Sequence, residues 1–223
     1  MKIAIDGPAG AGKSTVAKKV ADQLGYLYVD TGAMYRALTW KALQANVDIS
    51  SGEALLRLLN QCNLELKVES GTLKVMLNNQ DITAEIRTRD VTNLVSEVAS
   101  HQQVREAMVQ LQKEMAAKGN VVMDGRDIGT HVIPDAEVKI YLTASIEERA
   151  RRRYEELLTK GHKASLREIK QEIRDRDRKD KNRETAPLKK AADAVTVDTT
   201  GLSIDEVVNR ILKIVYQNSK QGV

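Results

Sequence analysis

The sequence predicts an α/β protein in which helices flank a central parallel sheet. Short apolar runs alternate along the chain with segments whose apolar residues recur at helical spacing. The first run, Lys2–Asp6, is followed by a glycine-rich turn and a helical segment that carries Val16, Val20 and Leu24. A second run at 26–30 follows directly. This strand, helix, strand order favours parallel pairing with a right-handed connection.

Composition indicates a globular chain, because 223 residues suffice to bury a substantial core. The hydrophobic residues, 42% of the total, fall in runs far shorter than the roughly 18 residues of a membrane span. The first residues lack the apolar segment of a secretory signal, so we expect a cytoplasmic protein. Cys62 is the only cysteine, which excludes an internal disulfide and predicts a small core residue. Three scattered histidines argue against a zinc centre.

Positive charge is concentrated in one segment. Residues 145–193 contain 16 Lys or Arg and 11 Asp or Glu, a net charge of 16 − 11 = +5, whereas the whole chain carries +4. Nucleic-acid binding would also favour stacking aromatics, and the chain has one Trp, six Tyr and no Phe. The segment therefore suits small phosphates, and we expect no nucleic-acid partner and no membrane partner.

Further along the chain, strands are predicted at 120–124, 137–142 and 194–198, which extend the main sheet. Helices are predicted at 33–45, at 52–60, over a segment with Val104, Met108, Leu111 and Met115 that ends near Gly119, and over 204–215. Three serines precede a glutamate by three residues, the spacing of a capping box, and so mark helix starts: Ser145, Ser165 and Ser203.

A different periodicity interrupts this order. Apolar and polar residues alternate over 64–68 and again over 73–77, on either side of Ser70 and Gly71. This pattern predicts an antiparallel hairpin inserted among helices.

Residues 7–14, GPAGAGKS, fit the phosphate-binding pattern G-x-x-x-x-G-K-[ST] between a predicted strand and a predicted helix. In that setting backbone N–H groups and the positive end of the helix converge on phosphate oxygens. Lys13 would reach the β- and γ-phosphates, and the Ser14 hydroxyl would be the Mg²⁺ ligand. The candidate residues for holding ATP are Gly7, Pro8, Ala9, Gly10, Ala11, Gly12, Lys13, Ser14 and Thr15.

The same loop could simply be a glycine turn between a strand and a helix, but its context favours phosphate binding. The loop alone does not distinguish a motor, a GTPase switch and a small-molecule kinase. No guanine-reading Asn-Lys-x-Asp pattern is present. Asp124 ends a short predicted strand and could lie near the metal.

A second phosphorylated ligand would need cations apart from this loop, because two polyanions repel each other. Three segments offer them. Arg36 lies one turn inside the helix that follows the second strand, and Arg126 follows a strand end between two glycines. The third segment holds arginines over 149–153 that do not all have an acidic partner at i,i+4, which favours a mobile lid. The alternatives are a solvated arginine, a local salt-bridge cluster and a solvated charged face.

Taken together, these residues resemble the bacterial cytidylate kinases, among the P-loop nucleoside monophosphate kinases. The strings that carry the resemblance cover nearly the whole chain and occur in family order: IDGPAGAGKST, DTGAMYRA, ITAEIRT, MDGRDIGT, PDAEVKIYL, ERARRR, RDRDRKDKNR with APL, and TTGLSIDEVV. The hairpin at 64–77 also resembles a family extension of the monophosphate-binding part.

The resemblance implies transfer of a phosphoryl group from ATP to CMP or dCMP, with Mg²⁺, and it implies residue roles. Arg36, Arg126 and Arg183 would hold the CMP phosphate; Ser96, Arg105 and Asp127 the cytosine edge; Arg176 and Asp180 the ribose. Arg149, Arg152 and Arg153 would face the ATP phosphates. The catalytic candidates are Lys13, Arg126, Arg149 and Arg153, and the substrate-binding candidates are Thr31, Tyr35, Arg36, Ser96, Arg105, Asp124, Arg126, Asp127, Arg176, Asp180 and Arg183.

For organisation, we expect a single P-loop kinase domain over 1–223, with an inserted monophosphate-binding part near 31–105 and a lid near 149–183. We expect a monomer. Three rival functions stay open at this point: UMP as the acceptor, an ATPase switch or motor, and a nucleotide-dependent RNA-binding module.

Overall fold

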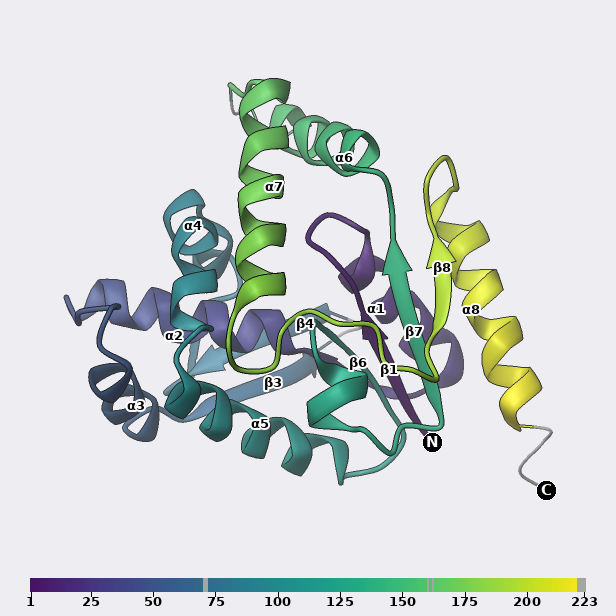
Figure 1. Ribbon diagram of the computed structural model, residues 1–223. Coiled ribbons are helices and arrows are strands. Elements are labelled where there is room, and N and C mark those ends of the chain that lie inside the picture. Colours follow the sequence, from purple (N-terminus) through teal and green to yellow (C-terminus); the bar gives the residue numbers. More distant parts are fainter. Residues whose placement is uncertain (70–71, 160, 162, 220–223) are drawn as a thin grey trace. The chain divides into compact units, whose positions relative to one another are not determined.

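A computed structural model describes residues 1–69, 72–159, 161 and 163–219 of the chain (Figure 1). Its main sheet has five strands in the order β2-β6-β1-β7-β8: β1 (Lys2–Asp6), β2 (Leu27–Asp30), β6 (Val121–Gly125), β7 (Val138–Thr143) and β8 (Val195–Asp198). β1 pairs in parallel with β6 and β7, and β7 pairs in parallel with β8. The predicted α/β class with a parallel sheet is confirmed, and each predicted strand lies within one or two residues of an observed one.

By its internal contacts the chain divides into two compact units: Met1–Leu27 with Gly119–Val223, and Tyr28–Lys118. The first unit contains α1 (Lys13–Leu24), α6 (Ile146–Thr159), α7 (Leu166–Asn182) and α8 (Ile204–Ser219). α1 contacts β6 and α8, and α6 contacts α7. The central strand β1 carries Ile3 and Ile5, which are fully buried, as expected for a strand covered on both faces.

α6 and α7 are consecutive helices of the first unit (Figure 1). They share an apolar core of their own. Ala150 on α6 packs with Ile169 and Ile173 on α7, and Tyr154 and Leu157 cover them. Most of the other exposed side chains of these helices are charged, although Leu158 and Leu166 are also exposed. The pair therefore has an internal hydrophobic contact that stabilises it.

The second unit combines helices with the predicted hairpin. Its elements are α2 (Thr31–Gln44), α3 (Gly52–Asn60), β3 (Leu64–Glu69), β4 (Thr72–Leu77), β5 (Gln80–Asp81), a 3₁₀ turn (Glu85–Arg87), α4 (Arg89–Val98) and α5 (Gln102–Ala116). β3 and β4 are antiparallel and β5 adds a third short strand. The hairpin prediction is confirmed, and the turn predicted at Ser70 and Gly71 lies outside the described residues. α2 contacts α4, and α3 contacts α5.

The three predicted capping serines all accept from a first-turn amide. The Oγ of Ser145 accepts from the N–H of Glu148, that of Ser165 from Glu168, and that of Ser203 from Glu206, at 3.2, 3.4 and 3.3 Å. At Ser203 the box is complete, because the Glu206 carboxylate also accepts from the Ser203 N–H at 2.8 Å.

Two predictions about the second unit need correction. Cys62 is half-buried rather than a core residue, because it lies in the short connection between α3 and β3. The helix predicted at 33–45 begins at Thr31, because the Asp30 carboxylate accepts from the Ala33 N–H at 2.7 Å and caps the helix two residues earlier. The helix α4 was not predicted at all.

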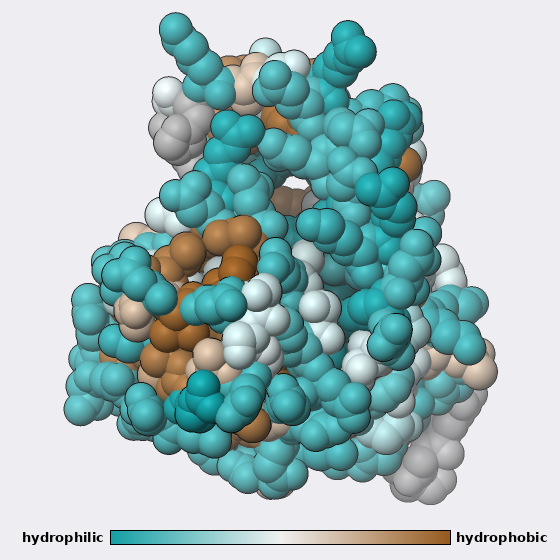
Figure 2. All heavy atoms as spheres, turned by 60° about the vertical axis from the view of Figure 1, so that its left-hand side comes forward, coloured by the Kyte–Doolittle hydropathy of each residue, from teal (hydrophilic) through white to brown (hydrophobic). Residues whose placement is uncertain are grey.

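The surface is largely hydrophilic on the face that Figure 2 shows, with one hydrophobic patch. Among the residues that the structure describes, no helix is long and apolar enough to cross a membrane. The same residues contain no group of three His, Cys, Asp or Glu side chains suited to a metal ion.

Ser203→Ala should lower the free energy of unfolding by about 1 kcal/mol, because it removes the acceptor for an otherwise unpaired amide of α8. Urea unfolding would measure this loss. Asn209→Ala, an exposed change within the same helix, is the control and should keep or slightly raise stability. Equal stability of Ser203→Ala and the unsubstituted protein would contradict the prediction.

Candidate phosphoryl-transfer site

The loop between β1 and α1 has a backbone that glycine alone can supply at its first position. Gly7 has a φ of +151°, and a Cβ there would lie 2.0 Å from the carbonyl oxygen of Leu142 on β7. Gly12 immediately precedes α1 with a φ of +87°, and no side chain caps that helix start. The first-turn amides of α1 are therefore not capped by a side chain, which suits an anion.

Carbonyl oxygens of this loop are bound by the protein itself. Pro8 accepts from the Lys13 ammonium at 2.8 Å, and Ala9 accepts from Arg149 at 2.9 Å. Ala11 accepts from the Thr199 hydroxyl at 3.4 Å. These contacts hold the loop in place through its carbonyl groups. The amide groups of the loop are therefore not needed to hold it and can bind a phosphate.

Lys13 is buried at the start of α1. Burial lowers the pKa of its ammonium well below the ordinary value, and the positive charge of Arg126 lowers the pKa further, while Asp124 acts in the opposite direction. A phosphate beside this group would compensate the lost hydration and favour the charged form of the ammonium. The environment of Lys13 thus favours an anionic ligand.

Ser14 and Asp124 supply the oxygen atoms that a magnesium ion would need. The Ser14 hydroxyl donates to the Asp124 carboxylate at 2.9 Å, across 110 residues of sequence. Asp124 lies on β6, next to β1 in the sheet. Asp124 therefore lies beside the loop, and a hydroxyl with a carboxylate fits the oxygen preference of Mg²⁺.

Three segments of the first unit bring several predicted substrate residues together. Arg126, just after β6, donates to Asp180 on α7 at 2.9 Å. Arg183, at the end of α7, lies 3.4 Å from the Asp127 carboxylate and donates to the Ala186 carbonyl at 2.6 Å. Burial raises the pKa of Asp180, but Arg126 and Arg176 more than offset this effect, so the pKa is lowered and the carboxylate stays ionised.

The second unit holds the other predicted substrate residues. Arg36 on α2 donates to the Asp30 carboxylate at 3.1 Å, so the residue that caps α2 also orients this arginine. Arg105 on α5 is buried, donates to the Ala99 carbonyl at 3.1 Å, and has its guanidinium 5.6 Å from the centre of the Tyr35 ring. Thr31 is also buried, and Ser96 lies on α4.

The arginines over 149–153 all have acidic partners, but only Arg151 and Arg152 have one at i,i+4; Arg149 pairs with Asp177 and Arg153 with Glu156 at i,i+3. Arg149 is buried and donates to Asp177 on α7 at 2.8 Å and to the carbonyls of Ala144 and Ala9. The outward-facing members pair along α6. Arg152 also donates to Thr199, at 2.9 Å to its hydroxyl, and Arg153 pairs with Glu156.

Asp6, a buried carboxylate next to the loop, is not among the residues that the sequence pattern predicts for the site. Its two oxygens accept the N–H groups of Ile128 and Gly129 at 2.9 and 2.8 Å. Burial raises the pKa of Asp6 to about 6, and Asp127 adds to the rise, while the two amides lower it. An acid at the end of an otherwise apolar strand, directly before the first loop glycine, was the available signal.

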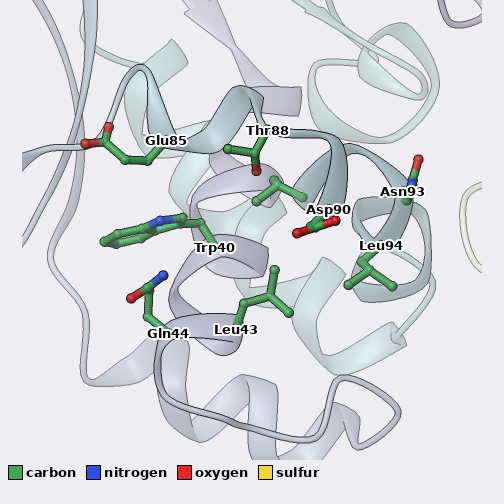
Figure 3. Close-up of a pocket in the computed structure, with 9 residues that line it drawn as sticks. Trp40, Leu43, Gln44, Glu85, Thr88, Asp90, Asn93 and Leu94 are labelled. Atoms are coloured by element: carbon green, nitrogen blue, oxygen red, sulfur yellow. The ribbon is translucent and has the colours of Figure 1, made fainter. Parts of the chain in front are cut away.

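A separate cavity of about 530 Å³ lies in the second unit (Figure 3). Its lining comes from α2 and from the segment around α4 and includes Trp40, Leu43, Glu85, Asp90 and Leu94. None of the predicted substrate residues lines it.

The raised pKa of Asp6 predicts a pH dependence of stability. A folded pKa of about 6 against an ordinary 3.8 means that the folded state holds the proton more tightly. The resulting stabilisation is complete below 3.8 and is lost as pH rises through 6, by about 3 kcal/mol in total. Urea unfolding at several pH values should show the unsubstituted protein losing stability relative to Asp6→Asn over that range.

Asp135→Asn is the matched control, because Asp135 is exposed and its pKa is lowered, chiefly by the hydrogen bond from Lys2. Asp135 should stabilise the folded protein at neutral pH, and this contribution should be lost as pH falls, the opposite of the dependence at Asp6. A pH-independent difference between Asp6→Asn and the unsubstituted protein would contradict the assignment.

Comparison with known proteins agrees with this geometry. The family model described as cytidylate kinase matches residues 3–217. A cytidylate kinase of Geobacillus kaustophilus (strain HTA426) is 59% identical over 217 residues, 97% of each chain, and one of Bacillus cereus (strain B4264) is 58% identical over 215 residues, 96% of each. A crystal structure of an uncharacterized protein from Eubacterium ventriosum ATCC 27560 has a TM-score of 0.55 at 13% identity, covering 97% and 98% of the two chains, which supports the fold alone. With a matching model over nearly its whole length and relatives this similar, the chain belongs to the cytidylate kinase family.

Proposed function

We propose that the protein transfers the γ-phosphoryl group of ATP to CMP or dCMP, giving ADP and CDP or dCDP. Family membership supports the reaction. The observation that carries the proposal is the loop before α1, in which an uncapped helix start, a buried lysine and a serine–carboxylate pair meet. Each of these features suits the triphosphate of a nucleotide.

On the donor side, the chain's task is to neutralise charge. Phosphoryl transfer passes through a loose transition state whose charge is spread over the transferred oxygens. The first-turn amides of α1 and the Lys13 ammonium would bind phosphate oxygens, and the ammonium would leave the Pro8 carbonyl to do so. Ser14 and Asp124 would hold Mg²⁺, which supplies further neutralisation of the phosphate charges.

On the acceptor side, Arg36, Arg126 and Arg183 would hold the phosphate of CMP, as the family resemblance implies. Each of these arginines lies against an aspartate, Asp30, Asp180 and Asp127 respectively. A carboxylate behind a guanidinium fixes its direction before the ligand arrives, which reduces the entropy lost on binding. Ser96, Arg105 and Asp127 would recognise cytosine, and Arg176 with Asp180 the ribose.

Arg149, Arg152 and Arg153 would act on the ATP side, from α6. Arg149 supports this placement, because it donates to the Ala9 carbonyl within the phosphate loop. Closure over both nucleotides would exclude water, which would otherwise hydrolyse ATP. We also propose that the protein works as a monomer in the cytoplasm.

Lys13→Ala should lower kcat by about 10³-fold, equivalent to about 4 kcal/mol of barrier, because the transferred phosphoryl group loses its buried cation. Steady-state assay of ADP release with Mg-ATP and CMP measures the effect. Lys19→Ala is the control, since Lys19 is on the same helix but pairs at the surface with Asp205. A folded Lys13→Ala protein with near-normal turnover would refute the role.

Acceptor choice is tested by incubating the protein with Mg-ATP and each of AMP, GMP, CMP, UMP, dCMP and dTMP, and following ADP release. CMP and dCMP should be phosphorylated far faster than the others, because a site that pairs with the cytosine amino group rejects a carbonyl. ATP alone should be hydrolysed slowly. Rapid hydrolysis without an acceptor would indicate a switch or motor ATPase, and submicromolar RNA binding without kinase activity would indicate an RNA-binding module.

A further inference from the structure

Asp6 joins two segments of the first unit that are far apart in sequence. It is the last residue of β1, and its carboxylate is held on both oxygens by the amides of Ile128 and Gly129, which follow β6. The residue is 4% exposed. Two charge-assisted hydrogen bonds in a buried place fix the direction of the backbone that donates them.

The backbone that Asp6 holds begins directly after Arg126 and Asp127. It forms a five-residue π-helical turn, Ile128–Val132, in which the Ile128 carbonyl accepts from the Ile133 N–H at 2.8 Å. Gly129 is confined on its other side, since a Cβ there would lie 3.1 Å from the Lys139 side chain. The chain that leaves Asp127 is thus held between Asp6 and Lys139.

If this contact served stability alone, a carboxylate would be poorly suited to it, because an ionised carboxylate costs free energy when it is buried. Burial and the nearby Asp127 make ionisation of Asp6 unfavourable. Ionised, however, it accepts two amides at once, which neither an asparagine nor a protonated acid does equally well. Strongly perturbed acids of this kind are concentrated at functional sites.

The phosphate loop does not depend on Asp6 to the same degree. Its carbonyls are held by Lys13, Arg149 and Thr199, and its first glycine is fixed by close contact with Leu142. Loss of the Asp6 contact should therefore affect the segment of Arg126 and Asp127 more than the donor loop.

We propose that Asp6 is a positioning residue for the phosphoryl acceptor, which holds the backbone at 128–129 so that Arg126 and Asp127 present their side chains to the nucleoside monophosphate. This inference rests on the proposed function and deepens it. Asp6 does not touch the reacting atoms; it acts through the two residues that precede its amide partners.

The test compares Asp6→Asn with the unsubstituted protein in steady-state assays with CMP and ATP. Asparagine offers one acceptor and turns its NH₂ group toward the second amide. We expect kcat/KM for CMP to fall by about 10²-fold, while the KM for ATP changes by less than about threefold. Hydrogen exchange should become faster in the peptide covering 126–132, and the free energy of unfolding at pH 7.5 should not fall.

Asp135→Asn makes the same chemical change at the surface. It should leave kcat/KM for CMP, the KM for ATP and hydrogen exchange over 126–132 unchanged, and it should slightly lower the free energy of unfolding because the contact with Lys2 is lost. Should Asp6→Asn fail to fold, Gly129→Ala disturbs the same backbone from the other side, because its Cβ would lie 3.1 Å from the Lys139 side chain, and a selective loss of roughly tenfold in kcat/KM for CMP is expected. An unsubstituted protein inactive toward every monophosphate would refute the proposed function and this role with it. With an active unsubstituted protein, an unchanged kcat/KM for CMP, an equal loss toward ATP, or a loss of activity that only follows a loss of stability would overturn the inference alone.

Discussion

The close approach of β1 to β7 at Gly7 is the constraint on which the rest of the site depends. A side chain there would overlap the Leu142 carbonyl, so the chain can leave the sheet only as glycine does. The path of the chain after β1 thus sets where α1 begins, and the N-terminus of α1 has no side-chain cap. Lys13 and Ser14 then come next to the carboxyl ends of β1 and β6, where parallel sheets bind their ligands.

Around that loop, arginines form ion pairs with buried carboxylates of the protein. Their charges are therefore already paired before a substrate binds. A guanidinium withdrawn from water is costly unless it is paired, and each pair also restricts the rotamers of a long side chain. The pairs are Arg149 with Asp177 and Arg126 with Asp180. An anion that binds here meets oriented donors, and pre-orientation is how a protein contributes most to phosphoryl transfer.

Helix α7 links Arg149 of α6 with Arg126, which follows β6. Asp177 and Asp180 are three residues apart and so lie on one face of the helix. One carboxylate binds Arg149, which in turn holds the Ala9 carbonyl of the phosphate loop, and the other binds Arg126. The helix pair of α6 and α7 has its own apolar core, so it can carry both aspartates as a unit. A displacement of α7 would therefore move the partners of Arg149 and of Arg126 at the same time.

Local signals in the sequence determined the strand, loop and helix order, the hairpin and the phosphate loop, because glycine conformation, capping and periodicity act over a few neighbouring residues. The same signals did not reveal α4, the half-buried place of Cys62, or the partners of the arginines over 149–153. Those depend on which segments meet: Ser14 and Asp124 are 110 residues apart, Asp6 and Ile128 122, and Arg126 and Asp180 54. The sequence by itself thus determined the kind of chemistry, whereas only the tertiary structure decided which carboxylate orients which cation, because burial and distance set those energies and neither is a local property of the chain.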